Sequence, residues 1–312
     1  MNRIAVIDMG TNTFNLIIAE YSAHSFKALY SDKQPVKLGQ KLKEEHIIDT
    51  SGISRIIQTV TYYKNIIEKY QVTDIKAIAT SSIRTAKNQK EILDTITTKL
   101  GLNVEVIDGE REAELIYIAN QFAIQNCRQD NSHSPYFIMD IGGGSTEFII
   151  AQQQALWKQS FLLGMARLID EIQPSDPITP DDINRVFAYL DNTLQPLHNA
   201  VQQFQPETLV GSSGVFDSIV EMIEANIRVL SKTESCCCIE KDDFYNIYHQ
   251  ILPLSYAERL NFKGLISMRA DMIVMSLLLI DYVLKKYSLQ SIIISFYSLK
   301  EGVIVEKMKA LK

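Results

Sequence analysis

Two carboxylates flank a glycine turn near the middle of the chain. Asp140 ends one apolar run, Glu147 begins the next, and Gly142, Gly143 and Gly144 lie between them. Consecutive glycines let backbone N–H groups converge on an anion such as phosphate, because no Cβ atom blocks the approach. Two acids beside such a nest are costly unless they bind a cation or transfer a proton. The stretch therefore predicts metal-assisted phosphoryl chemistry, and the alternative is a glycine-rich β-turn with solvated acids.

The N-terminus carries a similar stretch. Residues 6–19 align with residues 138–151 without a gap. The aligned positions share residue type or polarity: Asp8 with Asp140, Gly10 with Gly142, and Thr13 with Ser145. Self-similarity of this kind indicates two related halves. We expect each half to present a phosphate-binding turn, and the two turns to face one another across a cleft.

Composition and charge narrow the class of protein. The 312 residues suffice for two domains that each bury a core, and 46% hydrophobic with 22% charged residues is typical of a globular protein. The net charge of −6 argues against a nucleic-acid partner, since that affinity comes mostly from Lys and Arg at the phosphates. A polyanionic ligand is compatible with this charge where the positive field is local or supplied by a metal ion.

No segment predicts a membrane span or a secreted protein. The chain enters an apolar run directly after Arg3, so we expect no secretory signal. Its most apolar segment, residues 272–280, is far shorter than the roughly 20 residues that cross a bilayer. Cys127 and the run 236–238 lack the spacing of a zinc site or a disulfide framework, which predicts reduced thiols in a cytoplasmic protein.

The apolar pattern alternates between strands and helices, as in an α/β protein. Short apolar runs predict a hairpin at residues 137–150 and strands at 4–7, 14–21, 25–31, 74–79, 104–107, 155–163, 208–210 and 291–294. Helical spacing predicts helices at residues 53–70, 91–100, 113–122, 183–204, 242–252, 269–286 and 299–309. Thr179 is the expected N-cap before the helix at 183–204, with Pro180 at its first position and a kink at Pro196.

These elements divide the chain into two lobes. We expect an N-terminal lobe at residues 1–124, a linker at 125–134 and a C-terminal lobe at 135–312. The linker has no apolar pattern. The C-terminal helix, residues 299–312, is a candidate to pack back on the N-terminal lobe.

Three further sites could bind phosphate or take part in catalysis. Arg84 follows the hydroxyls at residues 80–82 at the carboxyl end of a strand, where open α/β sheets bind ligands; a surface ion pair is the alternative. Residues 211–214, Gly-Ser-Ser-Gly, form a turn ahead of a helix, which is another anion-binding geometry. Glu112 lies in the acidic first turn of a helix, where an acid often only stabilises the helix dipole.

Together these motifs resemble those of the exopolyphosphatase / guanosine-pentaphosphate phosphohydrolase (Ppx/GppA) family. Five segments in order carry the likeness: DMGTNTF (8–14), ATSSIRTAKN (79–88), VIDGEREAELIY (106–117), DIGGGSTE (140–147) and GSSG (211–214). The likeness extends over essentially the whole chain. It implies the actin-like, sugar-kinase-like ATPase (ribonuclease H-like) fold, with two duplicated α/β lobes, a mixed sheet in each and the active site in the cleft between them.

The resemblance also implies roles for individual residues. Glu112 would be the base that activates water, and Glu147 a second catalytic acid that positions the water or a metal. Asp140 would hold Mg²⁺ directly or through water, with Glu147 and Asp8 as further metal ligands; Mn²⁺ or a monovalent cation is an alternative ion. The implied phosphate-binding residues are Thr11, Asn12, Thr13, Arg84, Gly142, Gly143, Gly144, Ser145, Ser212, Ser213 and Gly214.

The implied reaction is release of terminal orthophosphate from inorganic polyphosphate. Guanosine pentaphosphate is the alternative substrate, and a homodimer is the implied assembly. An ATP-dependent kinase of the same fold and a polyphosphate or nucleotide sensor without catalysis are the other classes that we consider. Three positions depart from the family pattern, namely Asn15, Glu114 and Lys300, which stand where His, Arg and Arg are frequent.

Overall fold

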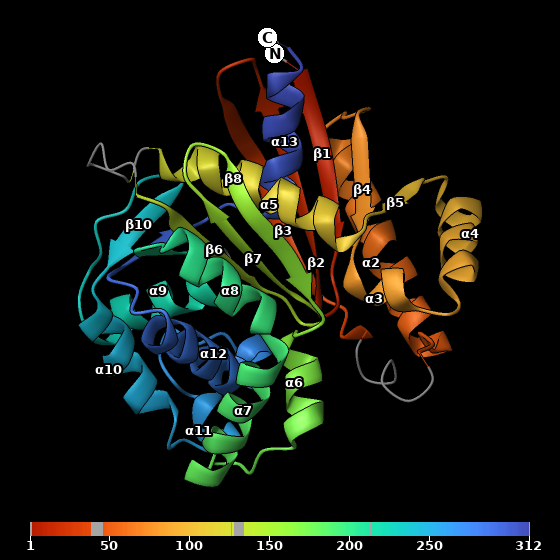
Figure 1. Cartoon of the computed structure of the whole chain (residues 1–312). Helices are drawn as coiled ribbons and strands as arrows, with labels where there is room; N and C mark the ends of the chain where they lie inside the picture. The colour runs from red at the N-terminus through yellow and green to blue at the C-terminus, as the bar shows by residue number, and fades with distance from the viewer. Residues whose placement is uncertain (1, 39–45, 126, 128–133, 213, 312) are drawn as a thin grey trace.

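Two mixed β-sheets form the framework of the chain (Figure 1). The computed structural model describes residues 2–38, 46–125, 127, 134–212 and 214–311. Residues 126 and 128–133 of the predicted linker, and Ser213 of the third predicted phosphate turn, lie outside the described residues.

The first sheet contains the N-terminal repeat. Its order is β3-β2-β1-β4-β5, with β1 (Asn2–Met9), β2 (Thr13–Tyr21), β3 (Phe26–Pro35), β4 (Ile75–Ala79) and β5 (Val104–Val106). β1 and β2 are an antiparallel hairpin, and the Gly10 N–H donates to the Thr13 carbonyl at 3.2 Å to close the turn. The register places Asp8 opposite Asn15, beside that turn. Helix α2 (Thr50–Lys69) leads to β4, and α3 (Ser81–Thr85) and α4 (Gln89–Leu100) connect β4 to β5.

The second sheet contains the glycine-turn repeat. Its order is β10-β11-β9-β6-β7-β8, with β6 (Tyr136–Ile141), β7 (Thr146–Ala151), β8 (Ala155–Phe161), β9 (Thr208–Ser212), β10 (Cys236–Ile239) and β11 (Ser291–Ser295). The Gly142 N–H donates to the Ser145 carbonyl at 2.9 Å, so the turn closes as in the first hairpin. Asp140 lies opposite Glu147 in the register. The predicted hairpin is therefore confirmed, with both carboxylates beside the turn.

The two sheets share one topology. In each sheet, three strands form an antiparallel meander. A fourth strand pairs in parallel with the first strand of the meander, and a fifth pairs in parallel with the fourth. These added strands are β4 and β5 in the first sheet, and β9 and β11 in the second. The second sheet differs by β10, which adds antiparallel to β11 at the edge. The predicted fold class, two duplicated α/β lobes with a mixed sheet in each, is confirmed.

Two helices fill the space between the sheets. Helix α5 (Gly109–Ile124) packs on β7 and β8 of the second sheet, whereas α13 (Leu299–Lys309) packs on β1 and β2 of the first. The two helices also pack on one another, and a Cβ atom on Gly302 of α13 would lie 2.1 Å from the Leu115 carbonyl oxygen of α5. Ile4 and Val6 of β1 and Ile138 and Ile149 of the second hairpin belong to this shared core. The boundaries of the two lobes stay a prediction.

The remaining helices surround the outer face of the second sheet (Figure 1). They are α6 (Met165–Ile172), α7 (Pro180–Thr193), α8 (Gln195–Phe204), α9 (Val215–Asn226), α10 (Lys241–Ile251), α11 (Tyr256–Arg259), the 3-10 turn η2 (Ser267–Arg269) and α12 (Ile273–Lys286). α12 is buried along most of its length, which agrees with its nearly uniform apolar sequence.

One predicted helix is two helices. Thr179 caps α7 and accepts from the Asp182 N–H, with Pro180 at the first position, as predicted. The expected single helix with a kink at Pro196 is wrong, because α7 ends at Thr193, with Leu194 as its C-cap, and α8 begins at Gln195 with Pro196 in its first turn. Proline is tolerated there since the first helical N–H groups have no intrahelical acceptor.

The prediction of four reduced cysteines is also wrong. Cys127, just after α5, forms a disulfide with Cys236 at the start of β10, across a sequence separation of 109 residues. The sequence could not reveal the pair, because only the topology brings the end of α5 beside the edge strand. Cys237 is a buried free thiol and Cys238 an exposed one.

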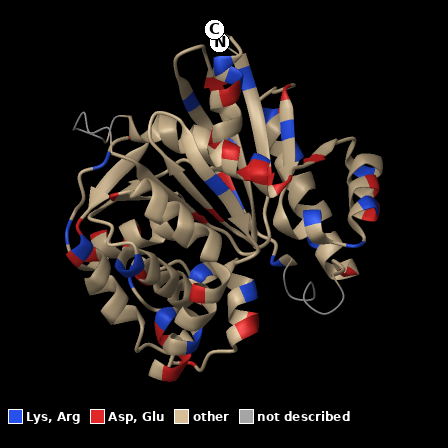
Figure 2. Cartoon of the chain, in the orientation of Figure 1, with Lys and Arg blue, Asp and Glu red and all other residues tan. Residues whose placement is uncertain are grey.

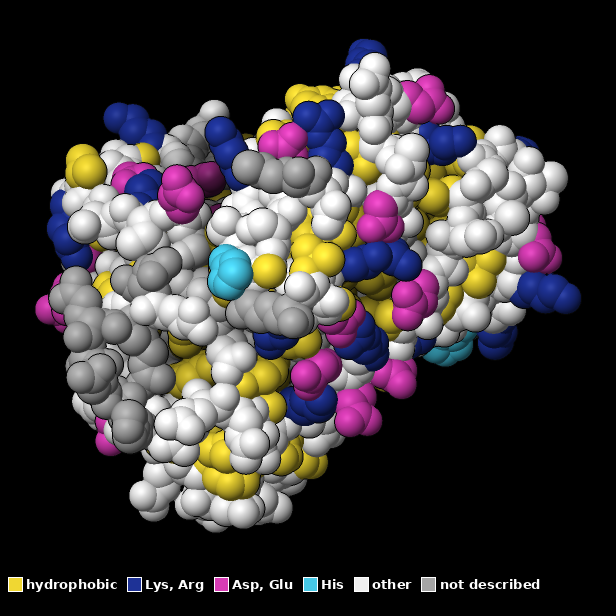
Figure 3. Space-filling model, turned by 90° about the horizontal axis from the view of Figure 1, so that it is seen from above, with side chains coloured by type: hydrophobic (Ala, Val, Ile, Leu, Met, Phe, Trp, Pro, Cys, Tyr) yellow, Lys and Arg dark blue, Asp and Glu magenta, His cyan; other side chains and the backbone are white. Residues whose placement is uncertain are grey.

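The surface mixes both signs of charge. Figure 2 shows Lys and Arg alternating with Asp and Glu over both lobes in that view, and Figure 3 shows the same mixture on the face seen from above. Among the described residues, no helix is long and apolar enough to cross a membrane.

Candidate active site

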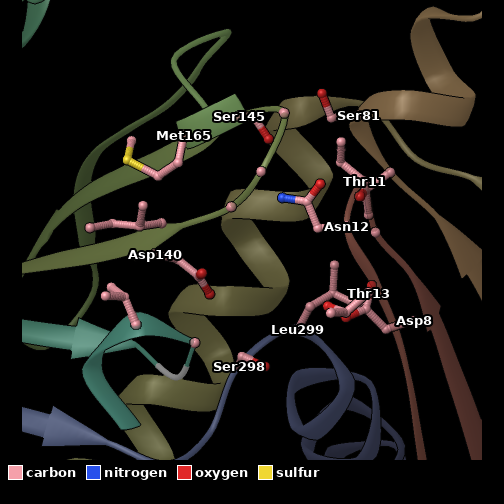
Figure 4. Close-up of a pocket in the computed structure, with 18 of the residues that line it drawn as sticks. Asp8, Thr11, Asn12, Thr13, Ser81, Asp140, Ser145, Met165, Ser298 and Leu299 are labelled. Atoms are coloured by element: carbon pink, nitrogen blue, oxygen red, sulfur yellow. The ribbon is translucent and has the colours of Figure 1, made fainter. Parts of the chain in front are cut away.

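A cavity of about 180 Å³ lies between the two hairpin turns. Its walls come from both sheets, from the first turn of α5, from η2 and α12, and from the start of α13. Figure 4 shows Thr11 and Asn12 on one side, Asp140 and Ser145 on the other, and Leu299 below them. The two repeats therefore face one another across a cleft, as the sequence predicts.

The two turns touch at one side of this cavity. A Cβ atom on Gly143 would lie 2.0 Å from Asn12 Nδ2, and one on Gly144 would lie 2.5 Å from Thr11 Oγ1. Side chains of the first turn thus occupy the space that the glycines leave open. The Asn12 amide also contacts the Met272 sulfur of the second lobe at 3.0 Å. The cleft is closed at this point by direct contact between the lobes.

The second hairpin contributes two acids that hydroxyl groups hold in place. Ser212 donates to Asp140 Oδ2 at 2.9 Å, and Ser160 donates to Glu147 Oε1 at 2.6 Å. Burial raises the pKa of Asp140 to about 7, and the nearby Glu112 carboxylate adds to that rise. Burial also raises the pKa of Glu147 well above its usual value, again with Glu112 contributing. Asp140 is therefore poised to gain or lose a proton near neutral pH, and Glu147 holds its proton to a higher pH than an ordinary glutamate.

Glu112 reaches the same cavity from α5. Asp108 caps this helix by accepting from the Arg111 N–H at 2.8 Å, which sets where its first turn begins. The Glu112 carboxylate accepts from Arg84 at 2.8 Å and also from the Thr80 hydroxyl. Burial raises the pKa of Glu112 to about 7, although Arg84 opposes the rise. A carboxylate with this pKa suits a general base at neutral pH.

The first hairpin contributes one acid and one amide. Asn15 donates to Asp8 Oδ2 at 2.9 Å, whereas the equivalent position in the second hairpin is an acid. Burial raises the pKa of Asp8, and Lys300 and Lys33 oppose the rise.

Three basic side chains line the cavity as well. Lys33 comes from β3, Arg269 from η2 and Lys300 from α13. Burial lowers the pKa of Lys33 to about 8, and the nearby Arg269 charge adds to the decrease. Burial by itself would lower the pKa of Lys300. The Glu301 carboxylate, 2.9 Å from the Lys300 ammonium, favours the charged form, and the pKa of Lys300 is raised as a result. The cavity thus combines acids that can transfer protons with cations that can neutralise an anionic ligand.

Sequence reasoning missed Lys33 and Arg269 as site residues. Each is a single basic residue on an element far from any glycine turn, so no local pattern marks it. Lys300 carried a signal, since it stands where the resembling family has Arg. No sequence signal marks Ser160, because its role depends on its position opposite Glu147 in the β7–β8 register.

Most predicted site residues line this cavity, and a few lie elsewhere. Those that line it are Asp8, Thr11, Asn12, Thr13, Glu112, Asp140, Gly142, Gly143, Gly144, Ser145, Glu147 and Gly214. Ser212 lies behind Asp140, fully buried, and acts on the cavity through that acid. Arg84 also lies behind the wall, where it binds Glu112 and the Ile107 carbonyl. Its ion pair is largely buried, in contrast to the surface pair considered as the alternative.

No ready-made metal cage is present in the part of the chain that the structure describes. No three His, Cys, Asp or Glu side chains converge there closely enough to hold an ion by themselves. Carboxylates from both hairpins nevertheless line one cavity, and Mg²⁺ is usually held by one or two carboxylates together with substrate phosphates and water. The donor set therefore fits an ion that binds with its substrate.

Comparison with known proteins identifies the family. The family model described as "Ppx/GppA phosphatase family" matches residues 17–311. The chain therefore belongs to the Ppx/GppA phosphatase family and is an enzyme of that family. A crystal structure of an exopolyphosphatase from Cytophaga hutchinsonii is similar, with a TM-score of 0.92 and 36% identity, covering 100% of this chain and 99% of that one.

Other relatives are more distant in sequence. A protein of Haemophilus influenzae provisionally named exopolyphosphatase is 25% identical over 305 residues, which cover 97% of this chain and 91% of the relative. A guanosine-5'-triphosphate,3'-diphosphate pyrophosphatase of Photobacterium profundum is 25% identical over 99% of this chain, which spans only 60% of that relative. The Aquifex aeolicus family member has a TM-score of 0.80 at 25% identity, covering 98% of this chain and 97% of that one.

Proposed function

We propose that this enzyme releases terminal orthophosphate from inorganic polyphosphate. The observation that carries the proposal is one cavity in which Glu112 and Glu147 lie with two glycine turns and three basic side chains. Hydrolysis of a phosphoanhydride needs an oriented water, a base and neutralisation of phosphate charge, with little covalent chemistry by the protein. The cavity offers a group for each of these tasks.

In the proposed reaction, Glu112 removes a proton from water as the water oxygen attacks the terminal phosphorus. The bond between that phosphorus and the bridging oxygen breaks, and the bridging oxygen leaves with the electron pair on the shortened chain. The products are one orthophosphate and a polyphosphate that is one unit shorter. Glu147, oriented by Ser160, holds the water in line. A positioned base contributes roughly 10²–10⁴-fold, so positioning and electrostatics supply the rest.

The two turns and the basic side chains would bind the phosphates. Backbone N–H groups of Gly142 to Gly144 and the hydroxyls of Thr11, Thr13 and Ser145 suit the terminal phosphate. Lys33, Arg269 and Lys300 suit the phosphates further along the chain, since each gives a positive charge in a buried setting where it is weakly screened. The set Asp140, Asp8 and Glu147 would hold Mg²⁺, which supplies charge neutralisation when bound.

A second substrate has a specific observation in its favour. One wall of the cavity is apolar, with Met268, Met272, Ile273 and Val215. A purine base could pack on such a wall, so guanosine pentaphosphate is the alternative substrate. An ATP-dependent kinase or a sensor without catalysis has no comparable observation in its favour. A cytoplasmic location and a homodimer stay predictions; the Cys127–Cys236 disulfide is of a kind that is rare in the cytoplasm.

The test compares phosphate release from polyphosphates of defined length, guanosine pentaphosphate and ATP, with and without Mg²⁺. We expect polyphosphate to give the highest kcat/KM, and excess chelator to abolish turnover. Glu112→Gln keeps the shape of the base but cannot accept the proton, so turnover should fall roughly 10²-fold or more while polyphosphate still binds. Glu110→Gln is the matched control, because Glu110 is exposed in the same helical turn. If turnover falls by the same small factor in both variants, Glu112 only stabilises the helix dipole and is not the base.

A further inference from the structure

A second cavity of about 150 Å³ lies against the first. It is formed by α6, by Tyr189 of α7 and by Ser82 of α3, and it shares Thr11, Gly143 and Gly144 with the catalytic cavity. The shared residues are therefore a wall between the two spaces. Neither glycine puts a side chain into this wall, and the side chains of Asn12, Thr11 and Ser81 pack on the glycines from the first lobe.

This wall is made of two separate pieces. Thr11 belongs to the turn of the first sheet, and Gly143 and Gly144 belong to the turn of the second. A small displacement of one lobe relative to the other would part the pieces without breaking a strand or a helix. The two cavities would then form one continuous passage.

The reacting groups lie next to the wall. Glu112 accepts a hydrogen bond from Thr80, which directly precedes Ser81, and Glu147 accepts one from Ser145, which directly follows Gly144. A Cβ atom on Gly144 would lie 2.7 Å from Ser81 Oγ, so the two segments meet at the wall. A phosphate cleaved between the two carboxylates is therefore released on the catalytic side of this wall.

Each cavity has a buried hydroxyl that awaits a partner. Ser81 lines the catalytic cavity and Ser82 lines the second one, and their side chains are only 2% and 1% exposed. Among the described residues, neither hydroxyl has a hydrogen-bond partner. Buried hydroxyls are nearly always paired, so two unpaired ones on either side of the wall indicate polar occupants in both spaces.

The charges give the passage a direction. Lys33, Arg269 and Lys300 are confined to the catalytic cavity, where they would retain the polyanionic chain. The charged residues of the second cavity are Arg167, Asp170 and Glu171, all on α6. Two acids beside one cation give this lining a net negative charge, which disfavours a long polyanion more than a small anion that contacts Arg167 alone.

We propose that the second cavity is the exit route for the product orthophosphate. The inference rests on the proposed phosphohydrolase function. The remaining polyphosphate stays bound in the catalytic cavity, while the cleaved orthophosphate passes the parted wall, contacts Ser82 and Arg167, and leaves beside α6. A chain can then be shortened again without first dissociating.

The test blocks the second cavity with a larger side chain. Ala166 of α6 lines the second cavity and not the catalytic one, and only its backbone N–H contacts the glycine turn, at 3.0 Å from the Gly143 carbonyl oxygen, so Ala166→Phe adds its ring to the second cavity and keeps that hydrogen bond. Ala257→Phe, an exposed alanine of α11, is the matched control. Acid-quenched samples measure orthophosphate as it forms from a defined polyphosphate, and a fluorescent phosphate sensor measures it as it is released. In Ala166→Phe we expect first-turnover formation as in the control, and release at least tenfold slower than formation.

Each other outcome overturns the inference. Formation and release that stay simultaneous in Ala166→Phe would place the exit elsewhere. Loss of first-turnover formation in a folded Ala166→Phe would make the cavity part of substrate entry. No orthophosphate from polyphosphate in the unmodified enzyme would overturn the proposed function and the route with it. Ser82→Ala gives an independent check: inhibition by added orthophosphate should weaken about tenfold, and unchanged inhibition would remove Ser82 from the route.

Discussion

The two hairpins have the same backbone and different chemistry. β1–β2 and β6–β7 close with the same turn hydrogen bond, and both place an aspartate beside the turn. The residue opposite that aspartate is Asn15 in the first hairpin and Glu147 in the second. Asn15 donates to Asp8, whereas Glu147 stands near Asp140 as a second acid.

Because of this difference, the first hairpin is suited to phosphate binding and the second to proton transfer. An amide beside an acid satisfies it and adds no charge, so the first hairpin can approach an anionic chain. Burial raises the pKa of both acids of the second hairpin, that of Asp140 to about 7, and the Asp140 charge adds to the rise at Glu147. In the proposed function, the duplicated scaffold thus uses both turns for phosphate contacts and only one of them for an acid pair.

The largest effect should come from making the second hairpin resemble the first. Glu147→Gln removes the acid but keeps an amide of similar shape, so we expect kcat to fall roughly 10²-fold or more with KM for polyphosphate little changed. Steady-state kinetics at several chain lengths measures it. Glu105→Gln, an exposed strand acid, is the control. A loss no larger than in the control would mean that both hairpins only bind phosphate.

The reverse change should have a smaller effect. Asn15→Asp places a second acid beside Asp8, and the added negative charge repels the substrate. We expect KM for polyphosphate to rise about tenfold, with a smaller change in kcat. Asn15→Ala loses the same hydrogen bond without adding charge, so the difference between the two variants isolates the electrostatic part. A higher kcat in Asn15→Asp would show that the first hairpin can also support proton chemistry.

The smallest expected effect is a shift in the pH profile of activity, which depends on the proposed base Glu112. In the proposed reaction Glu112 works as a carboxylate, so activity should rise as the pH increases through its pKa of about 7. Arg84 lowers that pKa, and Arg84→Ala should therefore move the rising limb of the pH profile about one unit upward. Arg84→Lys retains a charge and should shift the limb less. A higher KM with an unshifted limb would instead assign Arg84 to a substrate phosphate.

The sequence was informative where local geometry determines the outcome. A short glycine turn between two apolar runs fixes a hairpin register, so Asp140 and Glu147 had to lie beside the turn. The caps of α7 and the mixed sheets also follow from local patterns. Lys33 and Arg269 did not, because they approach one cavity from segments more than 200 residues apart. The Arg84–Glu112 pair and the Cys127–Cys236 disulfide depend in the same way on tertiary packing.

The position of α13 has a consequence for how the protein is made. This helix follows every other described helix and strand in the sequence, yet it covers β1 and β2, which are synthesised before all of them. The apolar side chains of Ile4, Val6 and Ile17 therefore stay without this cover on the ribosome until α13 has been synthesised. The other face of the first sheet has its own core from residues of the first lobe, so it is the face toward α13 that waits for this helix, and loss of the last turns of α13 would expose part of that apolar surface to aggregation.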